Sequence, residues 1–144
     1  MARVLGIDIG ARRVGLAISD ASGTLARPLT TLRVTGARDA VDRVVQEITR
    51  LAGQDGGLAK IVVGIPKRLD GTATDETDRA EAFVAALGAC TVVPIAREDE
   101  RLTSREAESR LAERERDWRA RKVKLDAAAA AIILQDFLDR ERSG

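Results

Sequence analysis

The stretch that decides the fold is Val4-Leu5-Gly6-Ile7-Asp8-Ile9-Gly10, near the start of the chain. Residues 4–7 form an unbroken apolar run, which predicts a buried strand that ends at Asp8. A carboxylate on a buried strand is costly unless it is paired or bound to a metal ion. The flanking glycines would let a ligand approach the backbone closely. The alternative is a turn aspartate at a strand end, although Asp is depleted in strands.

Two more strands are expected directly after this one. Residues 14–18 form an apolar run that ends at Ser19-Asp20, and residues 29–34 form the third expected strand. The connections between the three strands are short, and short connections favour an antiparallel meander.

The hydrophobic pattern then changes from the period of a strand to that of a helix. Apolar residues from Ala40 to Leu51 repeat on one helical face. Residues 61–65 are an unbroken apolar run, as expected for a strand buried on both faces. Residues 79–87 are expected to form a helix that ends before Gly88, and residues 91–95 a fifth strand.

The last third of the chain is expected to be helical. Thr103 and Glu106 fit a capping box that opens a helix to about Arg116, and a final helix is expected over residues 123–140. Strands entered through helices are normally parallel to their neighbours. The prediction is therefore an α/β fold in one domain covering residues 1–144. Its mixed five-stranded sheet has three antiparallel strands, then two parallel strands, and is flanked by helices.

Composition excludes several classes of chemistry. The 144 residues include no histidine and one cysteine, Cys90, which argues against histidine bases, catalytic triads with histidine, zinc sites and an internal disulfide. Neither a signal peptide nor a membrane span is recognisable, so a cytoplasmic protein without a membrane partner is expected. The net charge of +1 means that any affinity for nucleic acid must come from a local patch.

Acidic residues recur at places where the predicted topology can bring them together. Besides Asp8, Glu98-Asp99-Glu100 follows the fifth expected strand, and Asp126 opens the last helix. Each has an ordinary alternative: a solvated acidic loop for residues 98–100, and a favourable helix-dipole position for Asp126. Convergent carboxylates are what hard divalent cations such as Mg²⁺ and Mn²⁺ require, and two such ions can stabilise both oxygens of a reacting phosphodiester.

At this point the chain resembles the YqgF/RuvX family of RNase H-like nucleases, proteins associated with Holliday junction resolution and with pre-16S rRNA processing. Two departures are Ile9, where the family usually has proline, and Ser104, where it usually repeats threonine. Neither removes an acidic residue. The matching segments span nearly the whole chain in the family's order: Leu5–Gly10, Val14–Asp20, Arg27-Pro28-Leu29, Ile61–Pro66, Asp70-Gly71, Asp99–Thr103, Leu125-Asp126, Ala128–Ala131 and Ile133-Leu134-Gln135.

The resemblance implies a catalytic, metal-binding set of Asp8, Glu100 and Asp126 that uses Mg²⁺ or Mn²⁺. Asp99 is the alternate ligand, because adjacent residues of an extended segment point to opposite faces and one of the two acids should face the metal. The implied activity is hydrolysis of phosphodiester bonds in structured RNA, at the 5′ end of pre-16S rRNA. The alternative is a Holliday junction resolvase or another structure-specific DNA nuclease.

Basic residues that could contact the nucleic acid lie beside these acids in the sequence. The richest basic run, residues 114–124, is usually just a solvated face, but it immediately precedes Asp126. Trp118 within it could stack on a base or cover an edge of the core. The candidates are Arg12, Arg13, Lys67, Arg68, Arg101, Arg119, Arg121, Lys122 and Lys124.

Two alternatives belong to other classes of protein. The Asp-Ile-Gly motif also resembles the phosphate-binding strand of sugar kinases and actin-like ATPases, but those proteins need two lobes to enclose ATP. A non-catalytic nucleic-acid-binding module would explain the fold, but it would not need all three acids. A monomer and a homodimer both remain open, since a junction resolvase needs two active sites.

Overall fold

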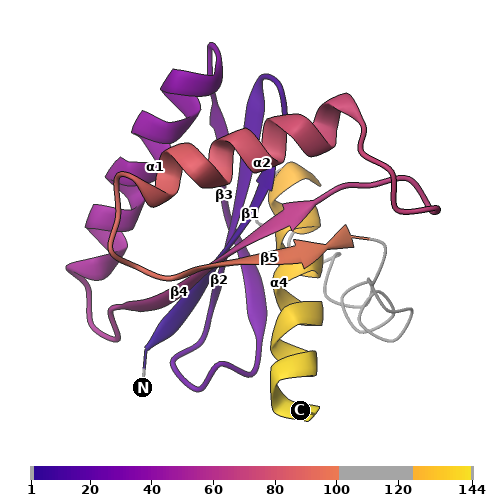
Figure 1. The fold of residues 1–144 in the computed structure, drawn as a ribbon. Helices are drawn as coiled ribbons and strands as arrows, with labels where there is room; N and C mark the ends of the chain where they lie inside the picture. The colour runs from indigo at the N-terminus through magenta and orange to yellow at the C-terminus, as the bar shows by residue number, and fades with distance from the viewer. Residues whose placement is uncertain (1, 101–124, 144) are drawn as a thin grey trace.

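A mixed five-stranded sheet forms the centre of the protein, with helices on both faces (Figure 1). The computed structural model describes residues 2–100 and 125–143, with side chains at residues 2–100 and 127–142. Its elements, in chain order, are β1 (Arg3–Ile9), β2 (Arg13–Ser19), β3 (Ala26–Arg33), α1 (Ala37–Ala52), β4 (Leu58–Ile65), α2 (Asp75–Gly88), β5 (Ile95–Asp99) and α4 (Leu125–Ser143).

The strand order is β3-β2-β1-β4-β5. β1 pairs with β2, and β2 with β3, in antiparallel fashion, because the connections are too short for a crossover. β4 is parallel to β1, and β5 is parallel to β4, as expected for strands entered through α1 and α2. The predicted fold, three antiparallel strands followed by two parallel ones, is confirmed.

The two faces of the sheet carry different cores. One face packs against α1 and α2 through large aliphatic side chains such as Leu5, Ile7 and Ile61, together with Phe83. The other face packs against α4 through a smaller cluster that includes Ala17, Val62, Ala130 and Leu134. Side chains alternate along each strand, so consecutive residues within β1, and likewise within β4, belong to opposite cores.

Two glycines let α4 approach the sheet closely. A Cβ atom at Gly6 of β1 would lie 2.7 Å from the Cβ of Leu134, and one at Gly64 of β4 would lie 2.6 Å from Cδ1 of Ile133. Contacts this short are not tolerated, so any larger residue would push the helix away. At the far end of α4, Glu141 lies 3.8 Å from Lys60. The helix therefore begins near the carboxyl ends of β1 and β4 and runs toward their amino ends.

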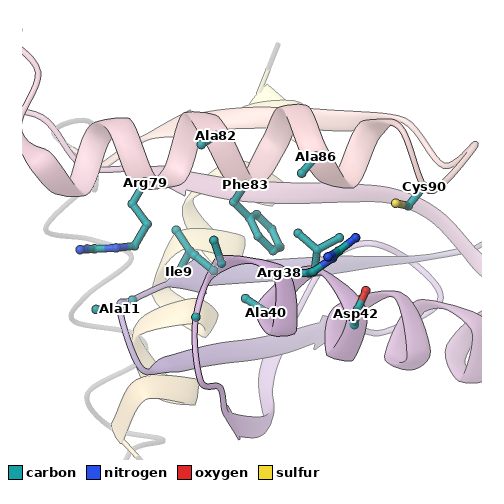
Figure 2. Close-up of a pocket in the computed structure, with 14 residues that line it drawn as sticks. Ile9, Ala11, Arg38, Ala40, Asp42, Arg79, Ala82, Phe83, Ala86 and Cys90 are labelled. Carbon is teal, nitrogen blue, oxygen red and sulfur yellow. The ribbon is translucent and has the colours of Figure 1, made fainter.

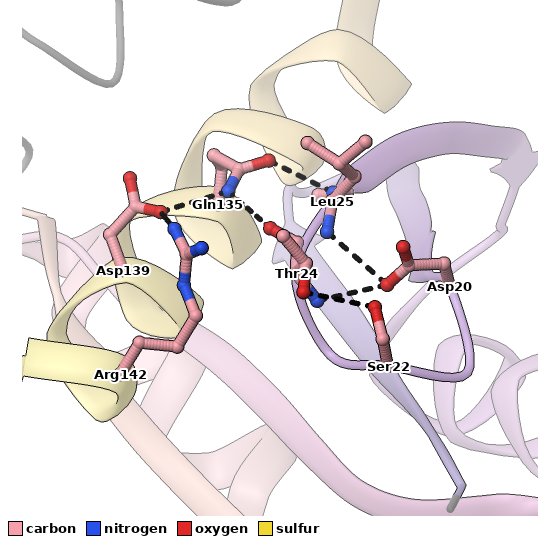
Figure 3. A network of polar contacts seen from close by, with 8 residues as sticks. Asp20, Ser22, Thr24, Leu25, Gln135, Asp139 and Arg142 are labelled. Carbon is pink, nitrogen blue, oxygen red and sulfur yellow. Dashed lines mark hydrogen bonds and ion pairs between the residues drawn. The ribbon is translucent and has the colours of Figure 1, made fainter.

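A side-chain network attaches α4 to the hairpin loop between β2 and β3 (Figure 3). Buried Gln135 accepts a hydrogen bond from the Ala26 amide at 2.9 Å and donates one to the Thr24 carbonyl at 2.9 Å. Asp20 in turn accepts hydrogen bonds from the amides of Thr24 and Leu25. Because Gln135 satisfies buried backbone groups on a distant hairpin, it holds the helix in register with the sheet.

The prediction of the fifth strand over residues 91–95 is wrong: β5 starts at Ile95 and continues to Asp99. Val92 is fully exposed, whereas residues 95–99 pair with β4. The strand accommodates charged residues because Arg97 and Glu98 form ion pairs with side chains of α2 and α4. Arg97, for example, donates to Glu81 of α2 at 2.6 Å.

Other predicted boundaries move by a few residues. The helix expected over 79–87 starts earlier, at Asp75, because Thr74 caps it and forms a capping box with Thr77. It ends at Gly88 rather than before it. β3 covers residues 26–33 instead of 29–34. The helix expected from Thr103 to Arg116 lies outside the described residues. No helix in the described part of the chain is both long and apolar enough to cross a membrane.

Candidate active site

Asp8 and Glu100 lie on the same face of the sheet, at the carboxyl ends of β1 and β5. Asp8 lies between Ile7 and Ile9, which belong to the α1–α2 core, so its side chain is on the α4 face. Glu100 follows β5 directly, and its Oε1 atom would lie 3.3 Å from a Cβ atom at Gly64. Gly64 of β4, the strand between β1 and β5, therefore leaves the space in which the Glu100 carboxylate sits.

Electrostatics link these two acids. Burial, together with the negative charges of Asp8 and Asp99, raises the pKa of Glu100 to about 7. An acid whose pKa is raised in this way is held where its own negative charge is disfavoured. Such a site gains from a bound cation, which would relieve the repulsion between the carboxylates.

Asp99 faces the other side of the sheet. It lies opposite Ile65 in the parallel pairing of β4 and β5, and the Ile65 side chain belongs to the α1–α2 core. Directly opposed residues of paired strands share a face, so Asp99 points away from the face that carries Asp8. This arrangement agrees with the expected alternation, with Glu100 as the acid on the side of Asp8.

The third acid of the expected set, Asp126, lies in the first turn of α4. It comes one helical turn before Ala130, whose carbonyl oxygen would lie 3.2 Å from a Cβ atom at Gly6. The main chain at Asp126 is therefore at the end of α4 nearest the carboxyl end of β1, but its side chain lies outside the described residues. Among the described residues, no group of three acidic or cysteine side chains is placed to hold a metal ion.

Two of the expected cationic sites lie at the same end of the sheet. Arg12 lies in the turn between β1 and β2, and Arg13 begins β2. Both are exposed, and with Asp8 they line a shallow hollow of about 300 Å³. Lys67 and Arg68, also exposed, follow the carboxyl end of β4. The remaining candidates, Arg101, Arg119, Arg121, Lys122 and Lys124, and Trp118 beside them, lie outside the described residues.

Directly after Lys67, Arg68 begins a tight turn that presents a leucine to solvent. The Gly71 amide donates to the Arg68 carbonyl at 2.8 Å, and Gly71 has a φ of 91°, which suits glycine. Asp70 accepts hydrogen bonds from the amide and hydroxyl of Thr72. Leu69, which the sequence reading did not single out, is 93% exposed.

A second, larger hollow of about 470 Å³ lies between α1 and α2, on the opposite face of the sheet (Figure 2). Phe83 and Ile9 line its interior, and Arg79 and Arg38 lie toward opposite ends. Gly10 and Ala11 line both this hollow and the smaller hollow beside Asp8, so the two hollows adjoin. Asp42 is the acid among the described residues that line the larger hollow, so no pair of acids like Asp8 and Glu100 lines it.

A buried ion cluster, which the sequence reading also missed, connects β5 to α4. Glu98 is 5% exposed and Asp136 is 2% exposed. The guanidinium of Arg140 forms ion pairs with both, and its Nη1 atom lies 2.5 Å from Oδ2 of Asp136. The solvated-loop interpretation of residues 98–100 is therefore wrong for Glu98. The spacing of Asp136 and Arg140, four residues apart on one helix, indicates an ion pair between them and could have pointed to part of this cluster.

Comparison with solved structures places this architecture in the RNase H-like class. Thermus thermophilus RuvC aligns over 99% of this chain and 96% of its own, with a TM-score of 0.63 and 16% identity. A structure of T. thermophilus RuvC with a Holliday junction substrate aligns over 100% of this chain and 97% of its own, with a TM-score of 0.60 and 17% identity. At such low identity the likeness establishes the fold.

The family model RuvX, described as Holliday junction resolvase, matches residues 2–140, and the chain belongs to this family. Curated relatives share the name "Putative pre-16S rRNA nuclease". The protein from Anaeromyxobacter dehalogenans is 42% identical over 96% of this chain and 97% of its own length. The one from Thermoanaerobacter pseudethanolicus is 37% identical over 98% and 99%. The protein is thus a nuclease, a hydrolase that acts on nucleic acid, and its family implies a divalent metal ion.

Proposed function

We propose that this nuclease hydrolyses phosphodiester bonds at the carboxyl ends of β1 and β5, with Mg²⁺ or Mn²⁺ held by Asp8, Glu100 and Asp126. The observation that carries the proposal is the meeting of Asp8 and Glu100 on one face, where burial and the charge of Asp8 disfavour the negative charge of Glu100. An arrangement that is unfavourable without a cation and that offers only oxygen ligands suits a hard divalent metal. When bound, the metal would polarise the scissile phosphate.

The residues of the site have separate roles in this proposal. Asp8 and Glu100 provide oxygen ligands, and Gly64 provides the space that lets the Glu100 carboxylate reach the centre. Arg12 and Arg13 lie beside Asp8 and would hold the phosphate backbone on either side of the cleaved bond. Because the pKa of metal-free Glu100 is about 7, a proton competes with the metal there, and metal binding should weaken as the pH falls below 7.

The proposed substrate is structured RNA, at the 5′ end of pre-16S rRNA, because the curated relatives carry that name over nearly their whole length. The second candidate is a Holliday junction or another structured DNA, which the description of the matching family favours. The proposal places the protein in the cytoplasm as one nuclease domain, either a monomer or a homodimer. A non-catalytic binding module would bind the same substrates but would not cleave them.

A cleavage panel tests this proposal. Wild-type protein is incubated with precursor rRNA, a four-way DNA junction and single strands, in Mg²⁺ or Mn²⁺ and in excess EDTA. We expect metal-dependent cleavage with precursor rRNA cut fastest, and loss of cleavage in Asp8→Asn. The control is Asp55→Asn, an exposed aspartate in the loop after α1, which should cleave at the wild-type rate. Full activity in EDTA, or in Asp8→Asn, would contradict the proposed site.

A further inference from the structure

Glu98 and Glu100 are two residues apart, on the same face of the same chain segment. Glu98 lies opposite Gly64 in the pairing of β4 with β5, and the Glu100 carboxylate also lies against Gly64. Along an extended chain two residues span about 7 Å. Any shift of Glu98 relative to α4 is therefore passed on to Glu100 through one intervening residue.

β5 needs an anchor on this face. Among the described residues it is the edge strand of the sheet, paired on one side with β4. α4 makes most of its contacts with β1, β2 and β3, away from β5. The apolar contribution of β5 to the α4 core is small, because Ala96 is its residue in that cluster. Backbone pairing with β4 fixes one side of the strand, and the α4 side depends on longer side chains.

Arg140 reaches across this space. Its guanidinium pairs with Glu98 on β5 and with Asp136 one turn earlier on its own helix. Both carboxylates are buried, whereas the Arg140 side chain is 39% exposed, so the arginine covers them from the solvent side. A planar guanidinium can hold two carboxylates in fixed directions, which a lysine ammonium cannot do as well.

We infer that Arg140 is a positioning residue for the metal site: through Glu98 it holds β5 against α4, and so holds Glu100 in place relative to the helix whose first turn contains Asp126. This inference rests on the proposed function, because it assigns Glu100 to the metal. Arg140 itself contacts neither the phosphate nor the metal. Buried ion pairs are a weak source of stability but can select one arrangement of the chain, and that selection is the role assigned here.

The test measures Mn²⁺ affinity of the full-length protein, without substrate, in four variants. Arg140→Met should weaken Mn²⁺ binding about tenfold, the lower end of the effect of removing a supporting residue from a metal site. Arg140→Lys should fall between Arg140→Met and wild type. Arg142→Met is the matched control, because Arg142 is exposed on the same helix and pairs with Asp139 rather than with β5. It should bind Mn²⁺ like wild type.

The fourth variant separates positioning from stability. The triple change Glu98→Gln, Asp136→Asn and Arg140→Met removes the buried charges together, so it should stay folded even if Arg140→Met does not. It should still bind Mn²⁺ about tenfold more weakly than wild type. The inference would be overturned if the folded triple variant bound Mn²⁺ as tightly as wild type. It would also be overturned if Arg142→Met weakened Mn²⁺ binding as much as Arg140→Met does.

Amide hydrogen exchange, measured without metal, distinguishes failure of this inference from failure of the proposed function. If wild type does not bind Mn²⁺, the proposed metal site is wrong, whatever Arg140 does. In that case the exchange rates still decide whether Arg140 holds β5 against α4. We expect Arg140→Met to speed exchange in β5 without changing exchange in β1. Unchanged exchange in β5 would overturn the claim that Arg140 holds β5 against α4.

Discussion

The two faces of the sheet are built by different means. The α1–α2 face is filled with large aliphatic side chains and Phe83. The α4 face uses alanines and two glycines, and it buries polar side chains, among them Gln135, Glu98 and Asp136. The comparison suggests that the first face supplies most of the hydrophobic stabilisation, and that the second gives up bulk packing to place charged groups accurately.

The largest expected loss of stability comes from the α1–α2 face. Leu5 of β1 is fully buried there, and Leu5→Ala should leave a cavity and lower the free energy of unfolding by about 2–5 kcal/mol. Mn²⁺ affinity of the folded fraction should change little, because Leu5 lies on the face of the sheet opposite to Asp8 and Glu100. Urea unfolding and Mn²⁺ titration of the same samples check both halves. A large fall in affinity would mean that the two faces are not separable.

The next effect should appear on the α4 face at Gly64. In Gly64→Ala the new methyl group would meet Ile133 at 2.6 Å and the Glu100 carboxylate at 3.3 Å. We expect the free energy of unfolding to fall by about 1–3 kcal/mol, as is typical of overpacking, and Mn²⁺ affinity to fall with it. Gly6→Ala is the matched variant: it would displace α4 without touching Glu100. Equal metal affinity in the two variants would contradict the role of Gly64.

A smaller effect is the pH dependence of stability without metal. The pKa of Glu100 is raised to about 7, so between about pH 4.5 and pH 7 the folded protein binds more protons than the unfolded chain. Stability from this group is therefore full at low pH and is lost as the pH rises through 7. Since the group is partly exposed, the loss should be about 1–2 kcal/mol.

Glu100→Gln should remove that dependence. The metal-free variant should be more stable than wild type at pH 8 and should differ from it less at pH 5. Urea unfolding at the two pH values, in EDTA, measures the difference. If the variant is less stable than wild type at pH 8, burial of the Glu100 charge and its repulsion by Asp8 and Asp99 do not destabilise the fold as its raised pKa implies.

The smallest expected effect concerns nucleic-acid binding. Arg12→Gln with Arg13→Gln should weaken binding and reduce the log–log salt slope by about 1.4–1.8, the value for two phosphate contacts. The paired control, Arg38→Gln with Arg79→Gln, removes two arginines from the hollow between α1 and α2. It should leave the slope unchanged. Fluorescence titrations at salt concentrations from about 50 to about 200 mM compare the two double variants.

Much of the fold could be predicted because it depends on local pattern. Apolar runs marked β1, β2 and β4, and short connections required the antiparallel pairing. β5 was misplaced because Arg97, Glu98 and Asp99 look like a loop until Glu81 and Arg140, the partners of Arg97 and Glu98, are known. Those partners are 16 and 42 residues away, and no periodicity reveals them.

The metal-binding role of the candidate site stays a prediction, but one part of its arrangement followed from local pattern. Alternation along an extended chain put Asp99 and Glu100 on opposite faces, and in the structure Glu100 lies on the side of Asp8 and Asp99 on the other. The raised pKa of Glu100 was not predictable, because it depends on burial and on an acid 92 residues earlier. Leu69 was missed because an exposed leucine and a buried one look alike in a sequence.

The central claim is that Asp8 belongs to a metal site and is not a structural turn residue, and thermal unfolding tests it most directly. Wild type and Asp8→Asn are melted in EDTA and in excess Mn²⁺, with Asp55→Asn as the surface control. In EDTA we expect Asp8→Asn to be at least as stable as wild type, because one of the like charges is gone. Mn²⁺ at a hundredfold excess over its Kd should stabilise wild type by about 2.7 kcal/mol, and the variant by less. The account is contradicted if Asp8→Asn is strongly destabilised in EDTA and Mn²⁺ shifts neither protein.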